Sequence, residues 1–271
     1  MKLIVPADLC LSSPVPSIVI IKNTGLAMSH SKTAIVTGAS RGIGAAIAKR
    51  LSQANYNIIV NYARSAGDAD QVVRQIHAGG GQALAIQADV SSTSDVCRLF
   101  DEAEQHFGSV DVLINNAGVL DLSSIAEVSE ESIHQHVDIN LKGVMFCSQQ
   151  AVNRLNNGGH IVNLSTSVVG LKLENYAVYA ATKAGVETFS AITAKELRGR
   201  DITVNAVAPG PTETDLFMQG KSEELVDKLR KMPPLERLAQ PEEIAAVVAF
   251  LCSPDGSWVN GQVIRANGGI V

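Results

Sequence analysis

Residues 33–54 read TAIVTGASRGIGAAIAKRLSQA and hold the pattern that decides the fold. The segment opens with a short, largely apolar run over 33–37, which has the length and composition of a buried strand. A loop with glycines at 38, 42 and 44 follows, and an Ala-rich helical pattern continues to residue 54. A glycine loop between a strand and a helix lets the backbone turn tightly and brings a pyrophosphate to the helix N-terminus. The stretch therefore predicts the opening β-loop-α unit of a nucleotide-binding sheet.

The same alternation of strand and helix patterns continues to the end of the chain. Further strands are expected at 57–61, 83–87, 110–114, 160–164, 202–207 and 262–266. Helices are expected at 68–78, 93–107, 141–155, 180–198 and 242–251. Such alternation is typical of a parallel sheet. We therefore predict an α/β chain with a single-domain Rossmann-type doubly wound parallel sheet, with about seven strands and helices on both faces.

Residues 1–30 differ in pattern from the rest. They contain prolines at positions 6, 14 and 16, no arginine, and no apolar run of the length that spans a membrane. Secretory and transit signals are poorly matched as well. We expect 1–30 to be a dispensable leader or the result of an upstream start, and 31–271 to be the cofactor-binding domain, so that protein expressed from Met28 stays soluble and active.

Composition excludes several classes of function. The chain has 271 residues, 46% of them hydrophobic and 18% charged, which is enough to bury a large core. A net charge of −5 argues against a nucleic-acid surface. The four cysteines are far apart and the six histidines show no metal-ligand spacing. We predict a cytoplasmic protein with reduced thiols and no metal, membrane or nucleic-acid site.

A second informative stretch follows the strand expected at 160–164. That strand ends in three consecutive hydroxyl residues, 165–167, and a helical pattern then carries Tyr179 and Lys183. Residues four apart on a helix share a face, so the ammonium can stabilise the phenolate and lower the pKa of the phenol. A hydroxyl at the strand end could hold a carbonyl oxygen against that phenol. This set predicts the reduction of a carbonyl group by a hydride donor.

The loop over 37–44, TGASRGIG, resembles that of the short-chain dehydrogenase/reductase family in its compact single-domain branch. The resemblance extends over nearly all of 32–271 because further motifs follow in order. These are Asn115-Asn116-Ala117-Gly118, Asn140, Tyr179-x-x-x-Lys183, Pro209-Gly210 with Thr212 and Thr214, and a C-terminal pattern of Gly261-Gln262 and Asn267-Gly268-Gly269.

The resemblance implies a role for each catalytic residue. Tyr179 would donate a proton to the carbonyl oxygen, and Lys183 would lower its pKa and hold the nicotinamide ribose. Asn140 would hold a water that connects the lysine to solvent. The family places its serine three residues before a glycine, which selects Ser167, whereas counting from the start of the strand selects Thr166. We take Ser167 as the candidate, with Thr166 and Ser165 as alternates.

The cofactor is predicted from charge near the second strand. No carboxylate lies between Asn55 and Gly67, where an NAD-selective site places one to bind the ribose, whereas Arg41 and Arg64 could bind a 2′-phosphate. We therefore predict NADP(H). The resemblance implies a cofactor site of Gly38, Ser40, Arg41, Gly42, Ile43, Gly44, Tyr62, Arg64, Ser65, Asp89, Val90, Asn116, Ala117, Gly118, Tyr179, Lys183, Pro209, Gly210, Thr212 and Thr214.

The expected substrate is a small or medium aldehyde, ketone or quinone. The substrate loop expected at 212–238 is rich in Leu, Met, Lys and Glu, and Leu171, Leu173 and Tyr176 could add an apolar wall. One alternative is a 3-oxoacyl-carrier-protein reductase, which the whole chain also resembles. An alternative of another class is a non-catalytic NADPH-binding protein. The helices at 141–155 and 180–198 resemble those that pair subunits in the family, so a homo-oligomer, as a tetramer, is expected.

Overall fold

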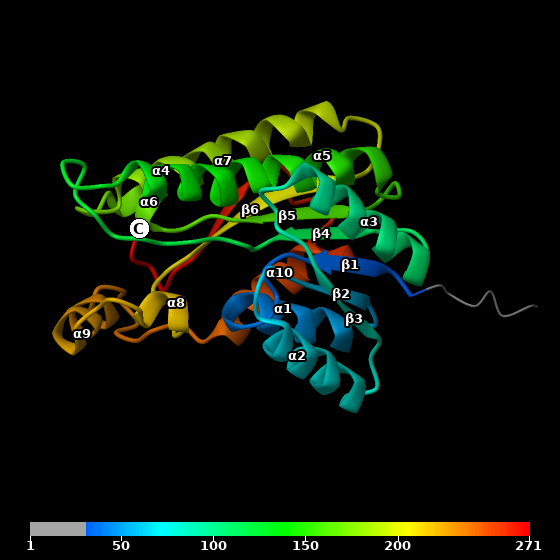
Figure 1. Ribbon diagram of the computed structural model, residues 1–271, viewed down its shortest axis with the longest axis horizontal. Helices are drawn as coiled ribbons and strands as arrows, with labels where there is room; N and C mark the ends of the chain where they lie inside the picture. Colours follow the sequence, from blue (N-terminus) through cyan, green and yellow to red (C-terminus); the bar gives the residue numbers. More distant parts are fainter. Residues whose placement is uncertain (1–30) are drawn as a thin grey trace, which may run out of the picture. The chain divides into compact units, whose positions relative to one another are not determined.

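The computed structural model describes residues 31–271, so the expected leader at 1–30 lies outside the described residues. Ser31–Val271 forms one compact unit. It is built on a seven-stranded sheet of order β3-β2-β1-β4-β5-β6-β7, in which every neighbouring pair of strands is parallel (Figure 1). This sheet confirms the predicted doubly wound α/β fold.

The strand order reverses beside β1. The chain runs outward from β1 through β2 to β3 and then returns to β4 on the other side of β1. In such sheets ligands bind at the carboxyl ends of the strands at this reversal point. The strands are β1 (Thr33–Val36), β2 (Asn57–Tyr62), β3 (Ala83–Gln87), β4 (Val112–Asn115), β5 (His160–Leu164), β6 (Thr203–Pro209) and β7 (Val263–Ala266).

Helices cover both faces of the sheet (Figure 1). One face packs on α1 (Gly42–Gln53), α2 (Ala66–Ala78) and α10 (Pro241–Leu251), and the other on α3 (Thr93–Phe107), α5 (Gly143–Arg154) and α7 (Ala177–Glu196). Successive strand residues point to opposite faces, so Ala34 and Val36 belong to the first core and Ile35 to the second. Every residue of β4 and β5 is buried, as expected for central strands of a parallel sheet.

Several helices lie where the sequence analysis expected loops or later starts. Before α5 the structure has α4 (Glu130–His136) and a π-helical turn, η1 (Val137–Lys142), and the three run on continuously. The expected substrate loop contains α8 (Asp215–Met218) and α9 (Glu223–Lys231). Short helices α6 (Val168–Leu171) and η2 (Pro254–Gly256) complete the set. The sequence contains a start signal for α4, namely Ser129, a residue type that favours helix N-caps. In the structure its hydroxyl caps the helix by accepting a bond from Ser132 N.

The described residues, 31–271, also bear on membrane and metal binding. No helix in this range combines the length and apolarity needed to cross a membrane. The same range holds no cluster of three or more His, Cys, Asp or Glu side chains suited to a metal ion. Cys97, Cys147 and Cys252 are free thiols, and burial raises the pKa of Cys147 and of Cys252 to about 12.

Candidate active site

The glycine loop connects β1 to α1 in a conformation that requires glycine. Gly38 and Gly42 have φ of 60° and 57°, in the left-handed region that other residues rarely adopt. A Cβ on Gly44 would collide with the carbonyl oxygen of Gly38 and the side-chain amide of Asn116. The loop therefore presents bare backbone at the start of α1, where unpaired N–H groups favour an anion.

Asn116 and Thr37 join the glycine loop to the end of β4. The Asn116 side-chain amide donates to the carbonyls of Thr37 and Gly38, at 2.9 Å in each case. The Thr37 hydroxyl accepts from the backbone N–H groups of Asn116 and Ala117, at 3.0 Å in each case. These four bonds join the carboxyl end of β1 to the carboxyl end of β4, so the asparagine motif supports the shape of the nucleotide loop.

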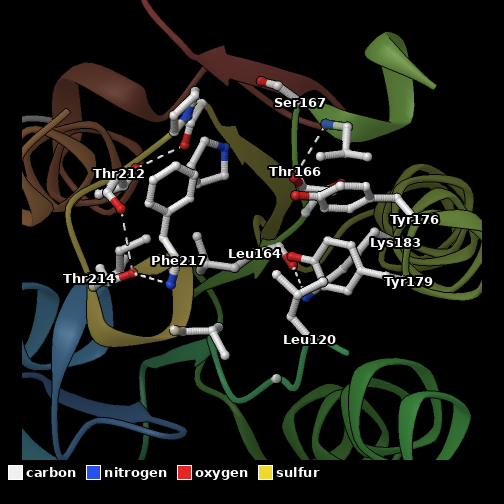
Figure 2. A pocket seen from close by; sticks show the side chains of 18 of the residues that line it. Leu120, Leu164, Thr166, Ser167, Tyr176, Tyr179, Lys183, Thr212, Thr214 and Phe217 are labelled. Carbon is white, nitrogen blue, oxygen red and sulfur yellow. Dashed lines mark hydrogen bonds between the residues drawn. The ribbon is translucent and has the colours of Figure 1, made fainter. Parts of the chain in front are cut away.

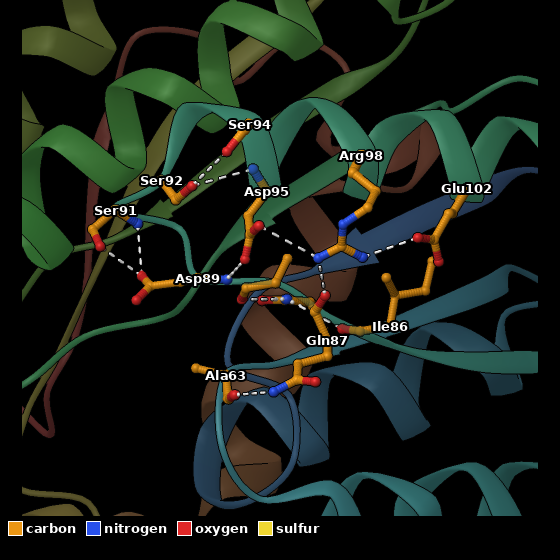
Figure 3. Close-up of polar contacts among 12 residues, drawn as sticks. Ala63, Ile86, Gln87, Asp89, Ser91, Ser92, Ser94, Asp95, Arg98 and Glu102 are labelled. Carbon is orange, nitrogen blue, oxygen red and sulfur yellow. Dashed lines mark hydrogen bonds and ion pairs between the residues drawn. The ribbon is translucent and has the colours of Figure 1, made fainter.

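The glycine loop lines one end of a cleft, and the loops after β2 and β3 form its other end. Figure 3 shows the hydrogen bonds around these two loops. Asp89 N donates to the Asp95 carboxylate at 2.9 Å, and the Asp89 carboxylate accepts from Ser91 N at 2.9 Å. The Gln87 side-chain amide donates to Ala63 O at 2.9 Å and links the two loops. This end of the cleft is therefore fixed by hydrogen bonds within the chain.

Arg41 and Arg64 give the cleft a positive edge. Both are exposed and line it, and in the part of the chain that the structure describes neither guanidinium is paired with a carboxylate. The carboxylates lining the cleft belong to Asp89, which is engaged by Ser91, and Asp215. A dinucleotide with a 2′-phosphate fits these residues, because an arginine fork binds phosphate well.

Tyr179 and Lys183 lie one turn apart on α7, and both face a pocket beside the cleft (Figure 2). Lys183 Nζ donates to Leu164 O at 2.7 Å and lies 6.0 Å from the centre of the Tyr179 ring. Burial lowers the pKa of Lys183 to about 8. Burial also raises the pKa of Tyr179 to about 12, against a smaller lowering by Thr166. The expected lowering of the phenol pKa by Lys183 is thus not seen here, because desolvation dominates and the ammonium is bonded to the strand carbonyl.

The three hydroxyl residues after β5 point in different directions. Thr166 lines the same pocket as Tyr179, and hydrogen bonding by its hydroxyl lowers the pKa of that phenol. Ser167 Oγ instead donates to Ala208 O at 3.2 Å, and Ser165 Oγ donates to the Glu187 carboxylate at 2.6 Å. The geometry thus favours Thr166 over the expected Ser167. The physical reason is that the chain turns into α6 directly after Thr166, which directs Ser167 toward β6.

Asn140 lies in the π-helical turn η1 and is fully buried. Its side chain bonds Val119 in both directions, accepting from the N–H at 2.8 Å and donating to the carbonyl at 2.9 Å. A Cβ on Gly118 would lie 3.2 Å from Asn140 Oδ1 and 3.7 Å from Lys183 Nζ, so the glycine leaves Asn140 and Lys183 close together. π-Helical turns occur often at functional sites, in keeping with this placement.

The pocket that Tyr179 faces is mostly apolar. The expected wall residues Leu171, Leu173 and Tyr176 line it, and Lys183 is the one charged residue among those lining it. The expected substrate loop at 212–238 contributes Leu216, Phe217 and Leu229, whereas Leu120, Leu164 and Ile270 were not expected from the sequence. The amphipathic pattern after Ser222 was a usable signal for α9 and hence for Leu229, whereas α8 is too short to show one.

The pocket and the cleft share residues and are therefore continuous. Of the residues predicted to bind the cofactor, those lining the cleft are Gly38, Ser40, Arg41, Gly42, Ile43, Gly44, Tyr62, Arg64, Ser65, Asp89, Val90, Asn116, Ala117, Gly118 and Thr214. Those lining only the adjoining pocket are Tyr179, Lys183, Pro209, Gly210 and Thr212. The fold therefore brings the whole predicted set to one edge of the sheet.

Known proteins match the chain over most of its length. A family model described as Enoyl-(Acyl carrier protein) reductase matches residues 38–271. A chloroplastic NADPH-dependent aldehyde reductase-like protein of Arabidopsis thaliana is 42% identical over 254 residues, which cover 89% of this chain and 94% of that protein. A hydroxynaphthalene reductase-like protein of Metarhizium majus is 41% identical over 253 residues, covering 89% and 95% of the two chains.

A solved structure gives the same result. A short-chain dehydrogenase from Burkholderia cenocepacia J2315, in complex with NADP, matches with a TM-score of 0.85 at 35% identity and covers 89% of this chain and 98% of that one. These matches over nearly the whole of residues 38–271 confirm the resemblance seen in the sequence. The chain belongs to the short-chain dehydrogenase/reductase family.

Proposed function

We propose that this protein is an NADP(H)-dependent reductase that transfers a hydride from NADPH to the carbonyl carbon of an aldehyde, ketone or quinone. The observation that carries the proposal is that Thr166, Tyr179 and Lys183 line one mostly apolar pocket that is continuous with the nucleotide cleft. When bound, NADPH supplies the hydride. The protein supplies binding, orientation and proton transfer.

The cofactor is NADP(H), and Arg41 and Arg64 would hold its 2′-phosphate. Two observations support this assignment: the cleft edge carries these two cations, and one of the two carboxylates that line the cleft, that of Asp89, already accepts a bond from Ser91 Oγ. The names of relatives agree, because the Arabidopsis protein is called NADPH-dependent and the Burkholderia structure contains NADP.

Tyr179 would act as the proton donor. The phenol is protonated at neutral pH, and because burial raises its pKa to about 12, proton transfer to the carbonyl oxygen depends on groups that stabilise the phenolate. The Thr166 hydroxyl would hold that oxygen in place. Lys183, next to Asn140, would place positive charge where the phenolate forms when Tyr179 loses its proton.

The pocket favours a neutral and largely apolar substrate. Leu171, Tyr176 and Phe217 contribute its apolar surface, and the ammonium of Lys183, its one charge, is bonded to Leu164 O. A substrate carboxylate or phosphate would therefore lack a free cation inside the pocket. The names of the aldehyde reductase and hydroxynaphthalene reductase relatives support the same class of carbonyl compound.

A carrier-protein thioester fits less well. An acidic carrier needs unpaired cations near the pocket mouth, but Arg230 and Lys231 of α9 both pair with Asp227. Arg237 likewise pairs with Glu243, at 2.6 Å. These three cations are therefore already engaged by carboxylates and offer less to an acidic carrier. A non-catalytic role is disfavoured by the presence of a complete hydroxyl, tyrosine and lysine set.

The experiment is a substrate panel. Purified protein is mixed with NADPH, and NADPH oxidation is followed with aldehydes, diketones, quinones and an acetoacetyl thioester. We expect turnover on one or more of the free carbonyl compounds and little on the thioester. Turnover on the thioester alone would move the assignment to the carrier-protein class, and NADPH binding without turnover on any compound would favour a binding protein.

Assembly and compartment remain predictions. We propose a homotetramer paired through α5 and α7, where Met145 and Ile192 are exposed. Light scattering should give four times the chain mass, and a monomeric mass would contradict it. The cytoplasmic location expected from the cysteines stays a prediction, since the Arabidopsis relative is named as chloroplastic.

A further inference from the structure

The segment 118–121 lies where the nucleotide cleft meets the substrate pocket. Gly118 lines both spaces, Val119 lines the cleft, and Leu120 lines the pocket close to Tyr179 (Figure 2). A shift of this short stretch would move a wall of the pocket relative to the proton donor. The groups that hold the segment in place therefore bear on how a substrate is accepted.

One of those groups is a buried histidine that the proposed chemistry does not use. His136, the last residue of α4, is 1% exposed. Its Nε2 accepts the backbone N–H of Asp121 at 3.1 Å, and its Nδ1 lies 2.7 Å from Ser132 O. Nε2 accepts a hydrogen bond, so it carries no proton, and Nδ1 faces a carbonyl oxygen, so it must donate one. These two partners therefore assign the neutral tautomer with the proton on Nδ1. Both ring nitrogens are thus satisfied by this one arrangement.

The same ring also touches the proton donor. The His136 and Tyr179 rings pack edge to face, with centroids 6.3 Å apart and an interplanar angle of 77°. Such an arrangement is favourable and directional. A second bond fixes Asp121, because Ser132 Oγ donates to its carboxylate at 2.9 Å. His136 therefore connects the segment that carries Leu120 with the helix that carries Tyr179.

We propose that His136 is a positioning residue that fixes Leu120 relative to Tyr179 and thereby sets the KM for the carbonyl substrate. Asn140 holds Val119 on one side of Leu120, and His136 holds Asp121 on the other. The kinetic part rests on the proposed reductase function. The positioning part is independent of it and can be measured without catalysis.

The test compares His136→Leu with His136→Gln. Leucine fills the space but leaves the Asp121 N–H without an acceptor, whereas the glutamine side-chain oxygen can accept that bond. For His136→Leu we expect faster amide hydrogen exchange over 119–124, KM raised about tenfold, kcat changed less than KM, and NADPH affinity close to wild type. For His136→Gln we expect exchange and KM near wild type.

A matched control is His160→Gln. His160 is also buried, but it begins β5 at the opposite end of the sheet from the site, where Nδ1 is bonded to Thr203 Oγ1 at 2.9 Å. This variant should leave both exchange over 119–124 and KM unchanged. If His136→Leu does not fold, Ser132→Ala removes the hydroxyl bond to Asp121 and a long contact of 3.5 Å with His136 Nδ1 but keeps the ring, and a smaller rise in exchange over the same segment is expected.

Three results would overturn the inference. Unchanged exchange and KM in His136→Leu would show that the ring does not hold the segment. A loss of kcat with KM unchanged would assign His136 to the chemistry instead of substrate acceptance. Equal defects in the glutamine and leucine variants would reduce its role to general packing. If the wild-type protein turns over no carbonyl compound, the proposed function fails, and the exchange measurements alone decide the positioning.

Discussion

Replacing Thr166 by alanine removes the hydroxyl that the structure places against Tyr179. The neighbouring Ser167→Ala is a matched control, because it removes a hydroxyl one residue away that is bonded to Ala208 O. Thr166→Ser keeps the hydroxyl and removes only a methyl group. Comparing the three variants separates a catalytic hydroxyl from a structural one at the same strand end.

The size of the expected effects follows from the contacts of each side chain. Removing one positioned donor to a developing oxyanion lowers kcat by about 10²–10³-fold. Apart from its contact with Tyr179, the Thr166 hydroxyl accepts a long bond from Val168 N, at 3.3 Å. Its loss should therefore cost about 1 kcal/mol of stability or less. Ser167→Ala loses a bond of 3.2 Å and should destabilise by a similar amount, with kcat close to wild type.

The assay measures kcat and KM with the best carbonyl compound from the substrate panel, together with NADPH affinity by fluorescence and thermal unfolding. Thr166→Ala should bind NADPH normally and lose turnover, while Thr166→Ser keeps most of it. The opposite pattern, with Ser167→Ala inactive and Thr166→Ala active, would refute the assignment drawn from hydrogen-bond partners.

Three further predictions concern the cofactor loop, cofactor choice and pH. Arg64→Asp should weaken NADPH binding at least tenfold and spare NADH, as measured by fluorescence titration, because it removes a phosphate-binding fork; equal weakening of both nucleotides would contradict the assigned role. Gly44→Ala places a Cβ against the Gly38 carbonyl and should cost about 1–3 kcal/mol of stability together with nucleotide affinity. Gly67→Ala, where a Cβ would meet nothing within 4 Å, should be neutral or stabilising in thermal melts. Burial lowers the pKa of His160 from 6.5 to about 4. Between these two pH values the histidine is protonated in the unfolded chain but neutral in the native chain, so acid favours the unfolded state. The free energy of unfolding should therefore fall by about 3 kcal/mol between pH 6.5 and 4, and urea titrations of His160→Gln should show a shallower fall.

Much of the fold could be predicted because its signals are local. The run before Gly38 and the Ala-rich pattern after Gly44 specify one strand and one helix, and similar pairs recur along the chain. The π-helical turn around Asn140 could not be predicted, because it depends on hydrogen bonds to Val119, 21 residues earlier. α8 is only four residues long and carries too little periodicity to identify.

The site shows the same division between local and distant causes. Tyr179 and Lys183 were recognisable from their spacing on one helix face. The choice between Thr166 and Ser167 was open because it depends on how the chain turns into α6. The pKa of Tyr179 was predicted in the wrong direction, since the sequence shows a neighbouring ammonium but not the desolvation around it or the bond of Lys183 to Leu164 O. The role inferred for His136 depends on its hydrogen bond with Asp121, which lies 15 residues earlier and cannot be predicted from a local sequence pattern.

The most direct test of the proposed reductase measures NADPH binding and NADPH oxidation side by side in the wild-type protein and Tyr179→Phe. The substitution removes only the phenolic oxygen, so NADPH should still bind. Turnover of the carbonyl substrate should fall by about 10²–10⁴-fold, the usual contribution of a positioned proton donor. Tyr179→Phe that retains wild-type turnover would remove Tyr179 from the mechanism, and wild-type protein that binds neither NADPH nor NADH would contradict the account from the glycine loop onward.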